Sequence, residues 1–363
     1  MELPRIEDFT VGLKYRIFQA ALNGLAAVGA GRWTLPGSRG LGGILMLHHV
    51  RPWTERPFAP NRLLEVTPEF LDAALARAKA LGFRIASLDA VVDALEAGIE
   101  FAAKPPLLAI TFDDGYRDNL DHALPVLRRH GAPAAVFVTP GFADRSAGLW
   151  WCDLEDAIAR ADEVRADLPD GPFAMATGDP AAKAAAFEAL YWRLRALPEP
   201  DMRTVVAKLA AGQGIDSLAT TERLCLDWAG LRRLAADPLI TIGAHTMTHP
   251  MLAKHDAATA CAEMADSRAA IERELGVPVR HLAYPVGDPT SAGPREFAMA
   301  RELGFRSAVT TRPGMLFPQH RDHLTALPRV SLNGNFQNVG QFGALLSGIP
   351  FHLWNKGRRL NVA

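Results

Sequence analysis

The amino-acid sequence predicts a parallel α/β fold, either a barrel or a doubly wound sheet. From about residue 42, short apolar runs alternate with longer segments of helical spacing, which is the pattern of parallel strands joined by crossover helices. The chain has 363 residues, of which 49% are hydrophobic and 22% are charged. This apolar content is sufficient for a large core and excludes general disorder.

Eight apolar runs are the expected strands, and they follow one another along the chain at 43–47, 83–87, 107–112, 134–138, 239–243, 281–284, 307–310 and 329–332. Several of the helices between them have clear ends. Thr67 is a typical N-cap residue with Pro68 in the first turn, and a glycine follows each of the helical segments 120–130, 258–275 and 295–303. These signals support an alternation of strand and helix.

Three segments fall outside this alternation. We expect an N-terminal helical segment at 1–41, a main domain at 42–332 and a C-terminal extension at 333–363. Within the main domain, the stretch at about 144–237 is rich in Ala, Leu, Arg and Asp with helical spacing, and it predicts a helical insertion over one face of the fold.

Composition and the N-terminus bear on partners and location. A net charge of −1 predicts no nucleic-acid binding. The cysteines Cys152, Cys225 and Cys261 are far apart in sequence and form no CxxC pair, which favours a reducing compartment. The N-terminus is a poor signal peptide and is too short to span a bilayer, so we predict a cytoplasmic protein.

The apolar spacing at 11–28 leaves three alternatives open for the N-terminal segment. It is a helix packed on the domain, an amphipathic segment in peripheral contact with a membrane, or an atypical signal. The sequence predicts no oligomeric state.

Polar residues follow four of the expected strands at the point where each strand ends. His48 and His49 follow the first strand, Asp113 and Asp114 follow the third, and His245 follows the fifth. The 281–284 strand runs into a Tyr-Pro sequence. Because the carboxyl ends of parallel strands meet at one edge, where ligands bind, we expect these residues to share a site.

The residue types at this edge predict a metal centre. His245 and His249 are four residues apart, and a carboxylate from the Asp113–Asp114 pair completes a set of two histidines and one carboxylate. Such a set suits zinc or another first-row divalent ion and leaves positions open for water. A bound dication would also remove the repulsion between two adjacent buried carboxylates.

Three sequence motifs carry a resemblance to a known family. Residues 111–116 read TFDDGY, residues 245–250 read HTMTHP and residues 284–287 read YPVG. In this order they resemble the motifs of the polysaccharide deacetylase family, the NodB-homology carbohydrate esterases, over roughly residues 42–332. The resemblance implies a distorted parallel (β/α) barrel and a metal-dependent hydrolase that removes N-acetyl, sometimes O-acetyl, groups from glycans.

The resemblance also implies roles for single residues. Asp113 corresponds to the general base, and Asp114, His245 and His249 correspond to the ligands of a divalent ion, with zinc as the expected metal. The third motif supplies the oxyanion and substrate loop, formed here by Tyr284, Pro285, Val286 and Gly287. Its oxyanion donor is the backbone N–H of Val286, which does not depend on the side chain.

Two features of the family are missing. Ala283 stands where members often have an arginine that orients the base, so Arg280 or another group takes that role. The late Leu-x-His motif that supplies the general acid is also absent. We predict His49 as the acid because it follows a strand, with His320 and His323 as alternatives.

The predicted function is metal-dependent removal of N-acetyl groups from an N-acetylhexosamine-containing oligo- or polysaccharide, of the chitooligosaccharide or exopolysaccharide type. One alternative is a deformylase or deacetylase of a lipid-linked sugar, and another is a non-catalytic carbohydrate-binding protein with a vestigial site. Trp150 and Trp151 either form a wall on which a sugar stacks or anchor the insertion to the core.

Overall fold

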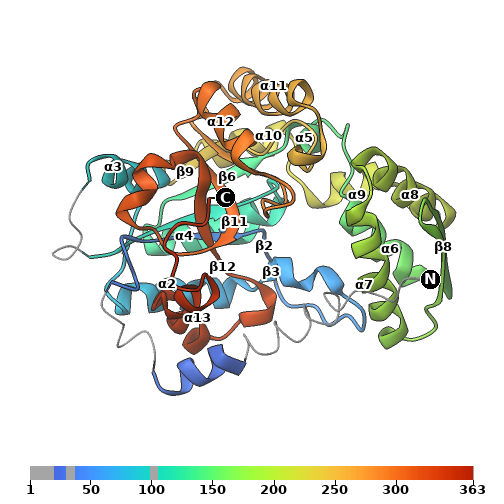
Figure 1. Cartoon of the computed structure of the whole chain (residues 1–363), viewed down its shortest axis with the longest axis horizontal. Helices are drawn as coiled ribbons and strands as arrows, with labels where there is room; N and C mark the ends of the chain where they lie inside the picture. Colours follow the sequence, from blue (N-terminus) through green and yellow to red (C-terminus); the bar gives the residue numbers. More distant parts are fainter. Residues whose placement is uncertain (1–19, 30–36, 99–104, 363) are drawn as a thin grey trace.

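The computed structural model describes residues 20–29, 37–98 and 105–362 (Figure 1). Most of the predicted N-terminal segment lies outside these ranges. Its described part is helical at 20–27, with Leu22 buried in the main core and Leu25 packed against it. None of the described helices is both long enough and apolar enough to cross a membrane.

Within the described residues, seven parallel strands close into a barrel, which confirms the predicted (β/α) fold. In order around the barrel they are β1 (Gly42–Leu47), β12 (Leu327–Ser331), β11 (Ser307–Pro313), β10 (His281–Ala283), β9 (Ile240–Ala244), β6 (Ala134–Val138) and β5 (Leu107–Phe112). The β1–β5 pairing, from Gly42 opposite Leu107 to Leu47 opposite Phe112, closes the ring. The short strand β4 (Arg84–Ile85) pairs with the start of β5.

Side chains fill the inside of the barrel. Every residue of β1, β5 and β6 is buried, as expected for parallel strands covered on both faces. Phe137 is one of the interior residues, and it requires a glycine at position 243, because a Cβ there would lie 2.4 Å from its ring. The barrel is therefore a packed core, and ligands must bind at its ends.

Helices surround the barrel (Figure 1). Those of the main domain and C-terminal extension are α2 (Pro68–Ala80), α3 (Leu88–Glu96), α4 (Leu124–His130), α5 (Pro140–Ala143), α10 (Trp228–Ala235), α11 (Ala257–Leu275), α12 (Pro294–Glu302), α13 (Val339–Leu346) and α14 (Ile349–Trp354). The predicted caps are present. Thr67 accepts a hydrogen bond from the Phe70 N–H at the start of α2, and Gly131 and Gly276 end α4 and α11 with positive φ.

Short elements complete the connections. These are β2 (His49–Val50), β3 (Glu65–Val66) and the turns η1 (Pro60–Leu64), η3 (Asn119–Ala123), η4 (Leu252–Lys254), η5 (Pro318–Asp322), η6 (Leu324–Ala326) and η7 (Gly334–Phe336). One of them corrects a prediction: the segment expected as a single helix over 120–130 begins as the π-helical turn η3 and becomes α-helical only at Leu124.

The insertion between β6 and β9 is mainly helical and has a core of its own. Its elements are α6 (Trp150–Arg160), β7 (Glu163–Leu168), β8 (Gly171–Ala176), α7 (Pro180–Ala196), α8 (Glu199–Gly212) and α9 (Ser217–Leu224). Leu154, Leu190 and Met202 are buried together in this core. The antiparallel β7–β8 hairpin was not predicted, although β7 alternates exposed and buried residues.

Candidate metal centre and active-site pocket

The predicted ligands Asp114, His245 and His249 come together at the carboxyl ends of β5 and β9. Asp114 Oδ1 lies 3.4 Å from His245 Nε2 and 3.3 Å from His249 Nε2, and all three side chains are buried. Among the described residues they form the one cluster of His, Cys, Asp or Glu that could hold a metal ion.

The chemistry of this cluster fits a divalent metal ion. Asp114 Oδ1 is buried and has no hydrogen-bond partner, which is costly unless a cation binds it. Ligand bonds of about 2.1 Å at roughly tetrahedral angles separate ligand atoms by about 3.4 Å, close to the separations found here. Burial raises the pKa of Asp114, but the two facing imidazoles outweigh burial and hold it well below its usual range. Asp114 is therefore ionised and available as a ligand.

Neighbouring groups orient the two imidazoles. His245 Nδ1 donates a hydrogen bond to the Ala283 carbonyl over 2.7 Å, which leaves the Nε2 lone pair facing Asp114. The His249 ring packs on Trp151, with ring centroids 4.8 Å apart, and the backbone N–H of His249 donates to Thr246 Oγ1 over 3.1 Å. Both ligands are held in place by the protein.

Unusual backbone conformations gather at this centre. Six non-glycine residues of the described chain have positive φ, and four of them are Asp114 (73°), Thr246 (62°), His249 (61°) and Val286 (60°). Each such residue costs on the order of 1 kcal/mol, and strain of this kind is concentrated at functional sites. The strained backbone at these four positions holds their side chains and N–H groups in the orientations found at the site.

Arg329 on β12 binds Asp113, and sequence analysis missed it. Its two terminal nitrogens lie 2.7 Å from the two carboxylate oxygens, and both side chains are buried. Burial raises the pKa of Asp113, but Arg329 outweighs burial and holds the pKa below its ordinary value. Arg280, the earlier candidate, instead contacts Asp89 over 3.1 Å and is largely exposed. An arginine inside a buried strand is the signal that could have revealed Arg329.

The side chains of the two histidines after β1 point in opposite directions. The structure corrects the prediction that His49 lies in the site. His48 lines the pocket, with Nε2 3.9 Å from Asp113 Oδ2. His49 points away, places Nδ1 2.6 Å from Asp118 Oδ2 and stacks on Tyr116. Successive residues of an extended chain face opposite sides, so only one of the pair can reach the metal centre.

The alternative acids His320 and His323 also lie elsewhere. His320 is buried in η5, near the start of β1, where its Nδ1 accepts a hydrogen bond from the Phe317 N–H. Burial lowers its pKa to about 4. His323 lies just before η6, which leads into the first residue of β12. Both are at the amino ends of the strands, opposite the metal centre.

In the loop at 284–287, one side chain lies in the core and another lines the pocket. Val286 lines the pocket and is the centre of a tight γ-turn, in which the Gly287 N–H donates to the Pro285 carbonyl over 2.6 Å. Within the described chain the Val286 N–H has no hydrogen-bond acceptor. Tyr284, in contrast, is buried and donates to the Thr325 carbonyl. Its side chain therefore belongs to the core.

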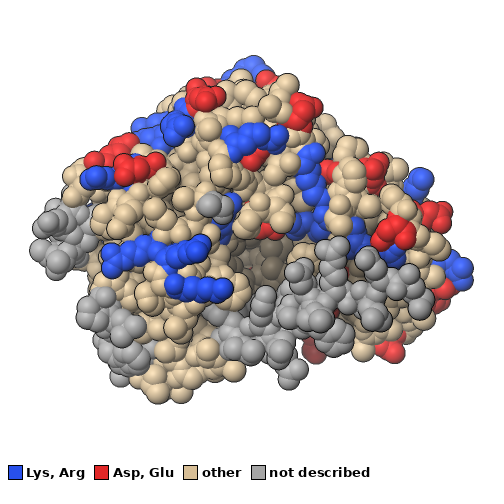
Figure 2. All heavy atoms as spheres, viewed as in Figure 1, with Lys and Arg blue, Asp and Glu red and all other residues tan. Residues whose placement is uncertain are grey.

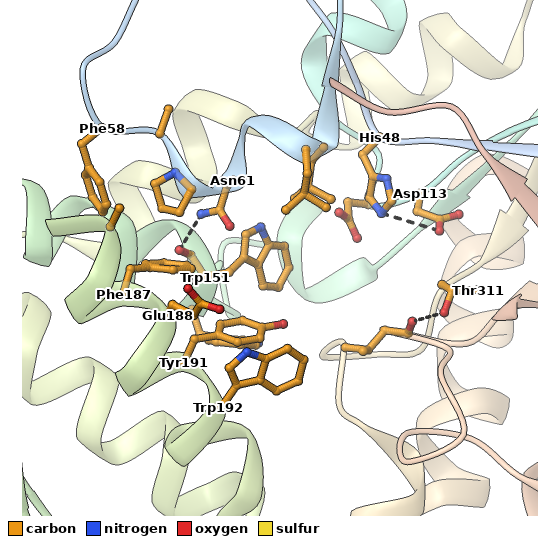
Figure 3. Close-up of a pocket in the computed structure, with 18 of the residues that line it drawn as sticks. His48, Phe58, Asn61, Asp113, Trp151, Phe187, Glu188, Tyr191, Trp192 and Thr311 are labelled. Carbon is orange, nitrogen blue, oxygen red and sulfur yellow. Dashed lines mark hydrogen bonds and ion pairs between the residues drawn. The ribbon is translucent and has the colours of Figure 1, made fainter. Parts of the chain in front are cut away.

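A pocket of about 650 Å³ connects the metal centre to the insertion. In Figure 3, His48, Asp113 and Thr311 lie on one side, and aromatic side chains of the insertion lie on the other. Trp150 and Trp151 are buried and also contribute to the wall, so they both anchor the insertion and line the pocket. On the face shown in Figure 2, acidic and basic side chains are intermingled over the outer helices.

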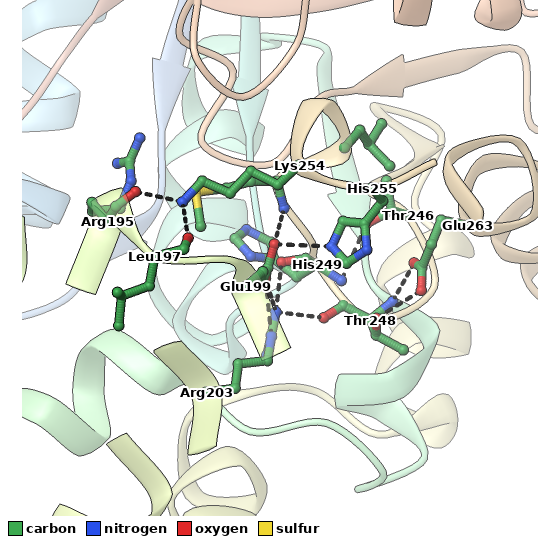
Figure 4. A network of polar contacts seen from close by, with 12 residues as sticks. Arg195, Leu197, Glu199, Arg203, Thr246, Thr248, His249, Lys254, His255 and Glu263 are labelled. Atoms are coloured by element: carbon green, nitrogen blue, oxygen red, sulfur yellow. Dashed lines mark hydrogen bonds and ion pairs between the residues drawn. The ribbon is translucent and has the colours of Figure 1, made fainter. Parts of the chain in front are cut away.

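Helix α8 of the insertion holds the loop that carries His249 (Figure 4). Arg203 donates to the carbonyl of His249 over 2.9 Å, and the buried Glu199 binds Arg203 and accepts from the Met251 N–H. On the other side of the loop, Glu263 binds both the N–H and the hydroxyl of Thr248. The insertion is thus connected to the metal centre by direct hydrogen bonds.

Comparison with known proteins identifies the relationship. Residues 102–308 match the family model described as polysaccharide deacetylase, which is more than half of the chain. The chain belongs to the polysaccharide deacetylase family. No curated protein sequence matches it significantly.

Solved structures of other deacetylases share the fold of this polysaccharide deacetylase family member. The deacetylase PplD of Streptococcus pyogenes, solved with acetate, is 17% identical, with 87% of this chain and 97% of that chain covered and a TM-score of 0.52. IcaB from Ammonifex degensii is 17% identical, with 84% and 97% covered and a TM-score of 0.52. A polysaccharide deacetylase from Bacillus cereus is 17% identical, with 84% of this chain and 68% of that chain covered and a TM-score of 0.51.

Proposed function

We propose that this protein is a metal-dependent hydrolase that removes N-acetyl groups from an N-acetylhexosamine-containing glycan. The observation that carries the proposal is the placement of an ionised base, Asp113, directly beside the cluster of Asp114, His245 and His249. Family membership supports carbohydrate deacetylation as the reaction class. The balanced reaction adds water across the amide, breaks the C–N bond and releases acetate and an amine.

Asp113 is the proposed general base. A divalent ion, with zinc as the proposed metal, would bind Asp114, His245 and His249, polarise the amide carbonyl and lower the pKa of water. Asp113 takes the proton from the attacking water, and Arg329 keeps the carboxylate ionised and fixes its two oxygens. The N–H of Val286, which has no acceptor within the described chain, donates to the oxyanion that develops on the acetyl carbonyl.

His48 is the proposed general acid in place of His49. It lines the same pocket as the metal cluster, and its Nε2 lies 3.9 Å from Asp113 Oδ2. Burial lowers the pKa of His48, although Asp113 and Asp114 oppose this effect. An imidazolium of lowered pKa is a strong proton donor, which suits expulsion of an amine.

Two neighbouring substitutions test these assignments. In Asp114→Ala, the metal content and acetate release from N-acetylchitooligosaccharides should both be lost, because a ligand is missing. In Asp113→Asn, metal should be retained while kcat falls by about 10²–10⁴, because only the base is missing. Elemental analysis and an acetate assay measure both effects. Loss of metal in Asp113→Asn, or full activity in Asp114→Ala, would contradict the assignments.

A further inference from the structure

The active-site pocket has a second half that the proposed chemistry does not use. It extends from the metal centre between η1 and the insertion helices α6 and α7 (Figure 3). Its wall is formed by large apolar and aromatic side chains, namely Phe58, Leu63, Trp151, Phe187, Tyr191 and Trp192.

The arrangement of these side chains follows from helix geometry. Ala184, Phe187, Glu188 and Tyr191 line the pocket and are spaced at i, i+3, i+4 and i+7, so they form one face of α7. Phe187 stacks on Tyr191 with ring centroids 5.7 Å apart, and Phe58 meets Phe187 edge to face at 6.2 Å. Together they make a continuous apolar surface that leads to the metal centre.

Part of this surface is exposed to solvent. Trp192 is 47% exposed and Leu63 is 44% exposed, and both line the pocket. Exposed large apolar side chains that gather in one concave place mark a binding site, because leaving them in water is unfavourable.

Polar side chains are a minority on this half of the pocket. Two of them already use part of their hydrogen-bonding capacity: the Asn61 amide donates to the Trp151 carbonyl over 2.8 Å, and the Tyr191 hydroxyl accepts from Arg195 over 3.2 Å. Glu188 is the charged side chain of the α7 wall. A hydroxyl buried here without a partner is unfavourable, whereas each buried methylene is favourable. An apolar chain therefore suits this wall better than further sugar rings.

We propose that the substrate is amphiphilic: a sugar that carries an apolar chain, as in a glycolipid. The acetamide group lies at the metal centre, and the apolar chain lies along Phe58, Phe187 and Trp192. This inference rests on the proposed function and names its substrate class. The apolar chain is assigned to the aromatic half, because this wall is continuous with the catalytic half and most of its side chains are apolar.

A series of alkyl N-acetylglucosaminides tests the proposal. The methyl, butyl and octyl glycosides carry the same acetamide, and N-acetylchitotetraose is a control of similar length with hydroxylated rings. We expect kcat/KM for acetate release to rise about two- to fourfold per added methylene over the first few carbons. A kcat/KM that is independent of alkyl chain length but rises with the number of sugar rings would overturn the proposal.

Substitutions in the aromatic wall give a second measurement. The ratio of kcat/KM for the octyl glycoside to that for the methyl glycoside should fall about tenfold in Phe187→Ala and in Trp192→Ala. Trp53→Ala is the matched control, because Trp53 is 52% exposed, contacts Arg62 and does not line the pocket. An unchanged ratio in both wall variants would contradict the inference.

A binding measurement separates this inference from the proposed function. Octyl glucoside, used below its micelle-forming concentration, has the alkyl chain but no acetyl group, so its effect on tryptophan fluorescence needs no catalysis. Binding that is weakened by Phe187→Ala, without acetate release from any glycoside, would support the apolar site and reject the deacetylase. Acetate release without chain preference, and no binding of octyl glucoside, would reject the apolar site and leave the deacetylase standing.

Discussion

The neighbouring carboxylates Asp113 and Asp114 have different partners, and this difference defines their roles. Asp113 is paired with the guanidinium of Arg329, whereas Asp114 faces His245 and His249 and keeps one oxygen unpaired. A divalent cation suits only the surroundings of Asp114, where a carboxylate oxygen and two imidazoles face one another. Two residues of the same type, adjacent in sequence, thus suit the proposed roles of base and metal ligand because of side chains that come from distant strands.

Arg329→Lys should weaken the base without removing the metal. Lysine keeps the charge but cannot contact both carboxylate oxygens at once, so Asp113 becomes less well oriented and its pKa rises. Because the base must be ionised, the acidic limb of the kcat/KM profile should move to higher pH. We expect kcat to fall about 10- to 100-fold.

Metal content is the control for this variant. A purely structural role of Arg329 would lower metal content and folding stability together and would leave the pH profile in place. An unchanged acidic limb would contradict the assigned interaction with Asp113.

His48 and His49 provide a matched pair of substitutions. His48→Gln should lower kcat by about 10²–10⁴, because the leaving amine loses its proton donor. His49→Gln should mainly reduce thermal stability, since His49 is buried against Asp118 and Tyr116. Acetate release per folded molecule distinguishes the two. A larger loss of kcat in the His49 variant would reverse the assignment.

Local motifs were sufficient to predict that Asp114, His245 and His249 come together, because they lie in short patterns at strand ends that can be recognised without knowing the fold. Arg329 and His48 could not be assigned in this way. Arg329 reaches Asp113 from 216 residues further along the chain, and this contact exists only because the barrel closes. The choice between His48 and His49 depends on which side of the chain faces the pocket.

At the scale of elements, the insertion positions the loop that carries His249 as well as the pocket wall. Arg203 and Glu199 on α8 hold the backbone at His249 and Met251. The loop has positive φ at Thr246 and His249, so it needs these external hydrogen bonds to stay in place. Sequence analysis predicted the insertion but not this connection.

Arg203→Met should therefore lower metal affinity by about tenfold, because the carbonyls of Thr248 and His249 lose their donor and the loop relaxes. Lys208→Met is the control, since Lys208 is exposed on the same helix. Metal dissociation constants measured by competition with a chelator would show the difference. Equal affinities in the two variants would contradict the role of α8.

The strands were the most predictable elements. Every expected apolar run became a strand of the barrel sheet, with ends shifted by a few residues, because near-continuous apolar runs mark parallel strands. The β7–β8 hairpin was missed, since its two-residue Pro169–Asp170 turn lies within an otherwise helix-forming composition. The alternation of exposed and buried residues in β7 is the signal that indicates this strand.

At the scale of the whole molecule, the two ends of the barrel differ in the residues that they carry. The carboxyl ends of the strands carry the metal cluster and the pocket, whereas His320 and His323 lie at the opposite end. The motif resemblance correctly predicted a distorted (β/α) barrel, which composition and periodicity alone left as a choice between barrel and open sheet. Closure depends on the long-range β1–β5 pairing and therefore has no local sequence signal.

The proposed mechanism predicts that deacetylation requires a divalent ion bound by Asp114, His245 and His249. The most direct test measures bound metal and acetate release from N-acetylchitooligosaccharides and alkyl N-acetylglucosaminides, before chelation, after chelation and after re-addition of zinc. We predict about one ion per chain, loss of acetate release with the metal and recovery on re-addition. Acetate release that persists in metal-free protein would contradict metal-dependent deacetylation.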